Sequence, residues 1–175
     1  MARNRAETKL ILVHCSGTRT RQDVGVEELH QRHLNLGVFS EAGPSGYHEV
    51  IRRSGLVELG RSPNAVGFGS TPAIDAIAYQ MCLVGGARRI RDKHDIPHWD
   101  ASTADDNFTR DQKKALAVRI EAALLVWPGA LVVPHYLLTW RPCPPFDVWA
   151  WQMSVFGYSH EQQATEFLAN LTEDE

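Results

Sequence analysis

Three short apolar runs in the chain have the length and composition of buried β-strands. They span residues 10–13, 77–84 and 130–133, and each is followed within three residues by serine, glycine or proline. A continuous apolar run of this length is typical of a strand that is covered on both faces. Residues 47–59 add a hairpin signal, because two short strand-like segments flank a Ser-Gly turn. The pattern therefore predicts a sheet with buried central strands.

Helical periodicity marks most of the segments between these strands. Residues 26–36 repeat apolar or histidine positions every three or four residues, and residues 109–127 begin with a Thr-Arg-Asp-Gln capping box. Two further amphipathic segments, 146–155 and 159–171, end the chain, and Ser159 is the expected cap of the second. Strands that alternate with helices, one hairpin among them, predict an α/β fold, a single domain with a mixed central β-sheet flanked by helices.

Two histidines follow predicted strands at their carboxyl ends, the edge where open α/β sheets place binding sites. His14 comes directly after the first apolar run and His135 two residues after the last. Cys143 lies eight residues beyond His135, in a proline-rich loop long enough to curl back around one ion. Two imidazoles and one thiolate suit zinc and leave a fourth position for water, the pattern of a catalytic site. A lone histidine is commonly a hydrogen-bonded core residue, so the spacing leaves both interpretations open.

Strand alternation makes further assignments near these positions. It places Tyr47, Glu49 and Ile51 on one face of the hairpin, where Glu49 is either a surface carboxylate or an additional general base. By the same rule Cys15 points away from His14, and we expect it to be a small core residue.

The longest irregular segment, residues 87–107, holds two more histidines. His94 and His98 have the spacing of a helical metal pair, but a proline between them argues against a helix. Trp99 and Trp140 are expected to pack in the core or, alternatively, to stack on sugars. The histidines of the first predicted helix are interpreted as surface or boundary residues: His30 and His33.

Composition excludes several classes of protein. The 175 residues are 43% hydrophobic and 22% charged, ordinary values for a soluble globular protein, and the net charge of −3 argues against direct nucleic-acid binding. Three widely spaced cysteines do not form a disulfide framework. No apolar run approaches the ~20 residues of a membrane span, and the N-terminal run is shorter than the roughly 7–15 residues of a signal-peptide core. We therefore expect the protein to start in the cytoplasm.

Seven motifs occur in one order and carry a resemblance to a known family. Together they resemble the zinc-dependent N-acetylmuramoyl-L-alanine amidases of type 2, relatives of the peptidoglycan recognition proteins, and in particular the small amidase endolysins of T-odd podophages. The likeness covers roughly residues 9–150. The motifs are ILVHCS (11–16), GYH (46–48), GLVELGR (55–61), AVG (65–67), CLVGG (82–86), NFT (107–109) and CPPFD (143–147).

The resemblance implies an activity and a set of site residues. That family hydrolyses the amide between N-acetylmuramic acid and L-alanine in peptidoglycan, with Zn2+ as cofactor. Its metal ligands correspond to His14, His135 and Cys143, and its active-site tyrosine, which orients water or stabilises the tetrahedral intermediate, corresponds to Tyr47. The family's basic residue two positions before the cysteine is usually lysine in the phage enzymes, and here it is Arg141. Arginine keeps the positive charge but is a poor proton donor.

The same resemblance implies an organisation and partners. Residues 1–155 would form the amidase-like zinc hydrolase domain and residues 156–175 a C-terminal helical extension of it. The substrate would be peptidoglycan, reached from the host cytoplasm with the help of a separate membrane-permeabilising protein. A monomer is expected, and an RNA polymerase is an open protein partner because some related podophage amidases bind one. The alternatives are a non-catalytic peptidoglycan- or protein-binding relative, and a metal-free cysteine hydrolase that uses Cys15 or Cys143.

Overall fold

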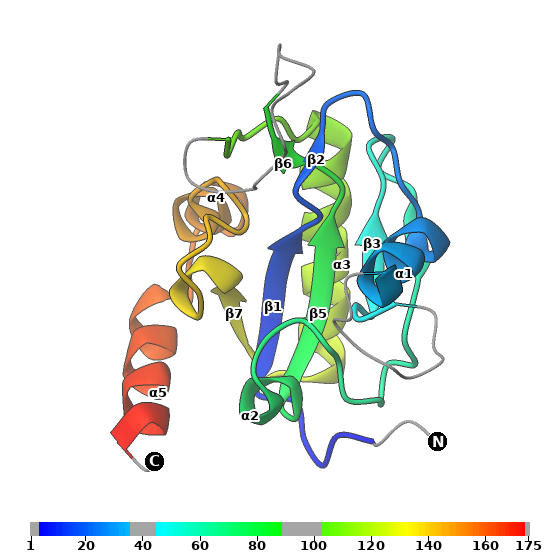
Figure 1. Cartoon of the computed structure of the whole chain (residues 1–175). Coiled ribbons are helices and arrows are strands. Elements are labelled where there is room, and N and C mark those ends of the chain that lie inside the picture. Colours follow the sequence, from blue (N-terminus) through cyan, green and yellow to red (C-terminus); the bar gives the residue numbers. More distant parts are fainter. Residues whose placement is uncertain (1–3, 36–44, 89–102, 174–175) are drawn as a thin grey trace.

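A five-stranded mixed sheet with strand order β4-β3-β5-β1-β7 forms the centre of the structure (Figure 1). The computed structural model describes residues 4–35, 45–88 and 103–173. β1 pairs in parallel with both β5 and β7, whereas β3 pairs in parallel with β5 and antiparallel with β4. The predicted α/β fold with a mixed sheet is confirmed. The five strands are β1 (Leu10–Cys15), β3 (Glu49–Ile51), β4 (Val57–Leu59), β5 (Ala78–Leu83) and β7 (Leu131–Pro134).

Helices cover both faces of this sheet. In Figure 1 the long helix α3 lies behind the sheet, and α1 and α2 lie in front of it. A separate parallel pair, β2 and β6, extends beyond the carboxyl ends of β1 and β5. The remaining elements are β2 (Thr18–Arg19), α1 (Val26–Asn35), α2 (Pro72–Asp75), β6 (Gly86–Ala87), α3 (Arg110–Val126), the 3-10 turn η1 (His135–Leu137), α4 (Val148–Phe156) and α5 (Glu161–Glu173).

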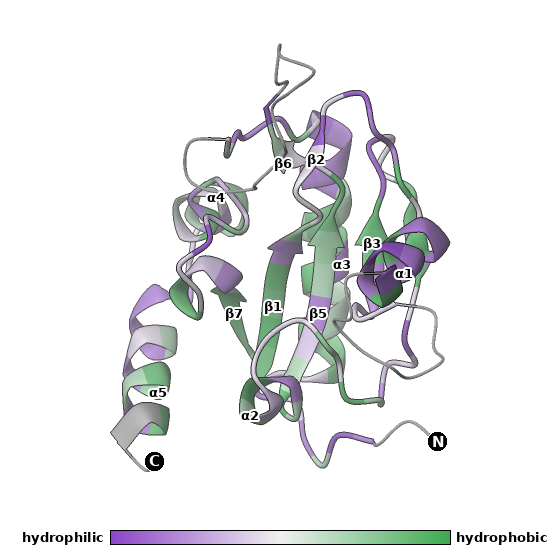
Figure 2. Ribbon diagram, viewed as in Figure 1, coloured by the Kyte–Doolittle hydropathy of each residue, from purple (hydrophilic) through white to green (hydrophobic). Residues whose placement is uncertain are grey.

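Strand β1 is buried on both faces, as its continuous apolar run predicts. Ile11 and Val13 pack in the cluster that includes α3, and Leu10 and Leu12 pack in the cluster that includes α2 and α5. Burial of each such side chain contributes roughly 1.5–3 kcal/mol. His14 continues the Leu10 and Leu12 face, so it emerges on the side of the sheet opposite α3. Figure 2 shows β1 hydrophobic along most of its length and polar towards its carboxyl end.

Helix α3 begins at the predicted capping box. The Thr109 hydroxyl accepts the Gln112 N–H, and the Gln112 side chain accepts the Thr109 N–H. The Gln112 amide also donates to the carbonyl oxygens of Ile51 and Val84, at 3.0 and 2.8 Å. The start of the helix is therefore anchored to the ends of two strands.

The hairpin forms as predicted, but the assignment of its first residues to faces is wrong. β3 begins at Glu49, and Tyr47 lies in a bend before it, where the alternation of a strand does not apply. Tyr47 packs with Val50 and Cys82, whereas Ile51 packs in the cluster of α3. The two side chains therefore lie on opposite faces of the sheet.

Glu49 is neither a surface carboxylate nor part of the site. Its side chain is fully buried, accepts hydrogen bonds from Arg119 of α3 at 2.9 and 3.0 Å, and accepts the Tyr79 hydroxyl at 2.7 Å. A buried carboxylate needs such partners because it has lost its hydration. The partner lies 70 residues away in the sequence, which local patterns do not reveal.

Helix α5 packs against the sheet and starts later than predicted. It begins at Glu161, two residues beyond the expected cap Ser159. Ala164 is fully buried in the cluster of Leu10 and Leu12, and the His160 ring accepts the Val132 N–H at 3.0 Å. No helix in the described ranges is long and apolar enough to cross a membrane. Residues 89–102, including His94, His98 and Trp99, lie outside the described residues.

Candidate metal centre and active site

His14, His135 and Cys143 converge at one edge of the sheet. His14 is the fifth residue of β1, and His135 opens η1 directly after the neighbouring strand β7. The loop between η1 and α4 brings Cys143 to the same place. One ligand atom from each residue lies within 4.8 Å of the other two, and the two imidazole centroids are 4.3 Å apart. Bonds of about 2.0–2.3 Å from one zinc ion to nitrogen and sulfur suit a cluster of this size.

The polar atoms of this cluster fit a metal. His14 Nε2 and His135 Nδ1 are shielded from solvent and have no hydrogen-bond partner among the described residues. Buried polar atoms of this kind are rare in folded proteins unless an ion or water satisfies them. Burial lowers the pKa of His14 to about 4, against a weaker opposing effect of Cys143, so the imidazole is neutral at physiological pH. The neutral form is the one that binds metals.

Cys143 is held in a setting that favours the thiolate. Burial by itself raises a thiol pKa, but the neighbouring side chains of Cys15, His135 and His14 hold the pKa of Cys143 well below its usual range. The backbone N–H of Cys15 donates to Cys143 Sγ at 3.2 Å. Thiolate is the metal-binding form of cysteine. Cys15 is buried, as expected, but its sulfur also lies 3.8 Å from that of Cys143, a contact that the sequence did not indicate.

Tyr47 forms a wall of the site beside His14. Its ring centroid lies 5.1 Å from that of His14 and 5.5 Å from that of His33. Burial, followed by the nearby cysteines, raises the pKa of the Tyr47 hydroxyl well above its usual value. The phenol therefore stays protonated and acts as a hydrogen-bond donor.

Arg141 lies at the rim of the site and not in the cluster. Its side chain is exposed, and its guanidinium carbon lies 5.3 Å from the centre of the exposed Trp140 ring. Its carbonyl oxygen accepts the Cys143 N–H at 2.8 Å, so its backbone helps to position the loop of that cysteine.

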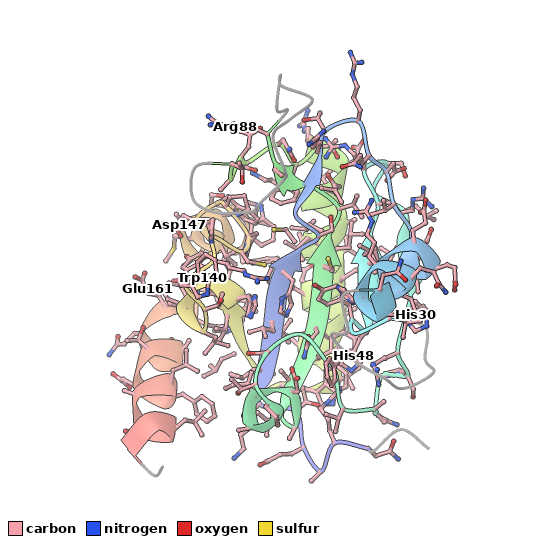
Figure 3. All side chains as sticks on the ribbon, in the orientation of Figure 1. His30, His48, Arg88, Trp140, Asp147 and Glu161 are labelled. Atoms are coloured by element: carbon pink, nitrogen blue, oxygen red, sulfur yellow. The ribbon has the colours of Figure 1, made fainter. Side chains whose placement is uncertain are left out.

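A cavity of about 740 Å³ opens above the cluster, and arginine is its dominant charge. The four arginines come from separate segments, and none forms a salt bridge within the described ranges of the chain. Among residues 4–35, 45–88 and 103–173, no aspartate or glutamate lines the cavity. Figure 3 shows Arg88 near the β2/β6 pair and Trp140 near η1. The protein thus has a basic cleft despite its net charge of −3. The four residues are Arg19, Arg32, Arg88 and Arg141.

Sequence reasoning missed several residues that shape this cleft. His33 was expected to be a surface or boundary residue, but it lines the cavity beside Tyr47, and His30 is buried. The available signal was spacing, because His33 lies four residues after Leu29 and therefore shares the inward face of α1.

A second missed feature supports the loop that borders the cluster. The buried Asp75 carboxylate accepts the backbone N–H groups of Gly69 and Ser70 at 3.2 and 3.0 Å, and the Gln80 amide at 2.6 Å. A Cβ at Gly69 would collide with the Gln80 side-chain oxygen and press on His14, so the glycine leaves room for both side chains. Helix α2, which carries Asp75, has only four residues, too few for a periodic signal.

Comparisons with solved structures show which proteins share this fold. The chain superposes on the Ph2119 endolysin of a Thermus scotoductus bacteriophage with a TM-score of 0.61 and 20% identity, covering 87% of this chain and 88% of that one. For the N-acetylmuramoyl-L-alanine amidase LysC of Clostridium intestinale the TM-score is 0.62 at 19% identity (87% and 86% covered). For Drosophila PGRP-LB it is 0.63 at 14% identity (91% and 88% covered). The fold is that shared by amidases and peptidoglycan recognition proteins.

Sequence relatives identify the family within this class. The chain is 35% identical over 148 residues to the endolysin of Klebsiella phage KP32, covering 84% of this chain and 87% of that protein. It is 35% identical over 149 residues to the endolysin of Escherichia phage T7, covering 85% and 88%. No family model matches the chain. The chain belongs to the family of phage endolysins that includes those of phages KP32 and T7.

Proposed function

We propose that the protein is a phage endolysin that hydrolyses the amide between N-acetylmuramic acid and L-alanine in peptidoglycan, with Zn2+ bound by His14, His135 and Cys143. The convergence of these three ligand atoms beneath a basic cleft carries the proposal. Membership of a phage endolysin family supports the lytic role. We also propose that the protein remains in the host cytoplasm until it is released to the wall.

The metal would supply the electrophile and the nucleophile. A zinc ion with three protein ligands polarises a carbonyl oxygen and lowers the pKa of a bound water towards ~7. The role of the protein is then to keep the ligands in their binding forms. The neutral His14 and the thiolate of Cys143 meet this requirement before any metal binds.

Tyr47 and Arg141 would stabilise the negative charge that develops on the carbonyl oxygen of the scissile amide. The Tyr47 phenol stays protonated and donates a hydrogen bond, and Arg141 provides positive charge from the rim of the cleft. The Tyr47 phenol does not exchange a proton readily near neutral pH, because its pKa is raised. Both residues are therefore assigned to binding and to stabilisation of charge.

The charge of the cleft matches the peptide part of peptidoglycan. Stem peptides carry free carboxylates, and the described lining of the cleft presents four arginines and no carboxylate that competes for them. Attraction between the positive arginines and the negative peptide carboxylates would steer and orient the substrate. The proposal thus places the anionic peptide over the arginine side of the cleft.

One assay on purified cell walls tests the proposal. Turbidity and newly exposed N-terminal alanine are followed with native protein, with fully chelated protein, and with chelated protein resupplied with zinc. We expect lysis and new alanine termini to vanish on chelation and return with zinc. Lysis that survives complete removal of zinc would contradict the metal role and favour the metal-free cysteine hydrolase.

A second candidate function is a peptidoglycan-binding relative that does not catalyse. The exposed Arg141 favours it, because this side chain stacks on Trp140 and stands where the phage enzymes usually have lysine. In the same assay, this candidate predicts stoichiometric zinc and binding to walls with no new alanine termini.

A further inference from the structure

A second, more open cavity adjoins the catalytic cleft on the side of η1 and α4. It has a volume of about 490 Å³, and Arg141 lines both this cavity and the cleft. Figure 3 shows Trp140 and Asp147 together in this region, beside η1 and the start of α4. The other lining residues are mainly aromatic rings and prolines: Tyr136, Phe146, Pro142, Pro144 and Pro145.

Trp140 stands apart from the other described tryptophans. Its side chain is 77% exposed, whereas Trp149 is 8% exposed and packs in a core cluster. Trp127 and Trp151 are partly buried against the other side of the sheet. An exposed indole that contributes nothing to the core and borders a cavity is typical of a binding surface.

The surroundings of Trp140 hold the ring in place without covering it. The Arg141 guanidinium lies over the ring, 5.3 Å from its centroid, which leaves the rest of the ring open at 77% exposure. Prolines at 142, 144 and 145 restrict the backbone that follows. Restriction of this backbone lowers the entropic cost of forming a binding surface here.

The two cavities differ in the charged residues that line them, and therefore in the ligands that they suit. Among the residues that the structure describes, the cleft is lined by four arginines and no carboxylate, whereas the second cavity is lined by Arg141 and Asp147. The Asp147 carboxylate is engaged, because it accepts the N–H groups of Trp149 and Ala150 as the cap of α4. The surface that a ligand meets in the second cavity is thus largely apolar and aromatic, and Thr139 also lines the cavity.

We propose that this second cavity is a saccharide subsite in which a neutral N-acetylated sugar ring of the glycan strand stacks on Trp140. The inference rests on the proposed function, since the scissile amide joins an uncharged glycan to an anionic peptide. The sugar lies on the Trp140 side of Arg141, and the peptide lies on the arginine side of the cleft. Arg141, which borders both cavities, marks the junction at which the amide is cut.

Binding of a neutral sugar probe tests the subsite independently of catalysis. The full-length protein is titrated with an N-acetylglucosamine tetramer by calorimetry and by NMR of the indole N–H groups. We expect saturable binding that shifts the Trp140 signal, is reduced about fivefold to tenfold or more in Trp140→Ala, and is largely restored in Trp140→Phe. Equal binding by wild type and Trp140→Ala, or no binding by wild type, would overturn the proposal.

Kinetics on two substrates separate failure of the subsite from failure of the proposed function. With intact walls, Trp140→Ala should raise KM about fivefold to tenfold with kcat little changed. With a lactoyl-peptide that contains the amide but no sugar, Trp140→Ala and wild type should match. Equal losses on both substrates would overturn the subsite and show a general effect on the loop. If wild type cleaves neither substrate, the proposed function fails, while the sugar titration still decides the subsite.

Discussion

The backbone N–H of Cys15, the last residue of β1, donates a hydrogen bond to Cys143 Sγ at 3.2 Å, although the two residues are 128 positions apart. A hydrogen bond from an amide to a thiolate is charge-assisted and stronger than one between neutral groups. It fixes the distal loop to the strand that carries His14. Two of the three proposed ligands are therefore positioned by one short segment of backbone.

Removal of the Tyr47 hydroxyl tests its assignment as an oxyanion donor. We expect Tyr47→Phe to lower kcat on walls by about 10²–10³-fold, the usual effect of losing one such donor, with KM and zinc content nearly unchanged. The ring and its packing against His14 are retained in this variant. Metal content measured beside the kinetics provides the control. Full activity in Tyr47→Phe would remove the hydroxyl from the mechanism.

Substitution of Arg141 tests whether activity needs only a positive charge at this position, which is usually lysine in the phage enzymes, or the guanidinium itself. Arg141→Lys keeps the charge, so we expect activity to be kept or raised, and Arg141→Gln should lose about tenfold or more in kcat/KM. Lysine also has an ordinary pKa of about 10.4, so its activity should decline at high pH where that of wild type does not. A complete loss in Arg141→Lys would show that the planar guanidinium is itself required.

The sequence predicted the positions that depend on short stretches of chain. The apolar runs located β1 and β7, and because His14 and His135 follow them directly, both histidines were expected at one edge of the sheet. The Thr109 capping box located the start of α3 for the same reason, since all of its partners lie within four residues. The catalytic and ligand roles of the site residues remain predictions.

The features that the sequence did not reveal depend on partners far apart in the chain. Periodicity cannot say that β1 lies between β5 and β7, because strand order is decided by how the helices pack. Glu49 was misplaced because its partner Arg119 is 70 residues away. Tyr47 was misplaced because the strand starts two residues later than its pattern suggests, so Tyr47 lies in the bend before the strand, where side chains do not alternate between faces.

The arginines of the cleft are expected to set the affinity for anionic stem peptides. We predict that Arg19→Gln combined with Arg32→Gln raises KM on walls about threefold to tenfold at low salt, and that the loss shrinks as salt is added because exposed charges are screened. Arg110→Gln is the matched control, since Arg110 is exposed at the start of α3 and does not line the cleft. An equal effect of the control, or no dependence on salt, would contradict a steering role.

His48 should make the free energy of unfolding depend on pH. Its ring is buried, Nδ1 accepts the Gln80 N–H at 2.9 Å, and burial followed by nearby charges lowers its pKa to about 3. The ordinary histidine pKa is about 6.5. Between about pH 6.5 and 3, His48 is therefore protonated in the unfolded chain but remains neutral in the folded protein. The contribution of His48 to the free energy of unfolding is therefore fully present above pH 6.5. It is lost as the pH falls, by up to about 1.4 kcal/mol per pH unit.

The variant His48→Gln separates this titration from the general loss of a buried side chain. We expect His48→Gln to be less stable than wild type at pH 7, because the hydrogen bond to Gln80 is disturbed, but to lose less stability between pH 6.5 and 4. Urea unfolding followed at half-unit steps of pH measures both quantities. His160→Gln is the comparison, because His160 is only half-buried and its pKa is lowered by burial alone. If His48→Gln kept the full slope of wild type, the proton uptake would have to be assigned to another histidine.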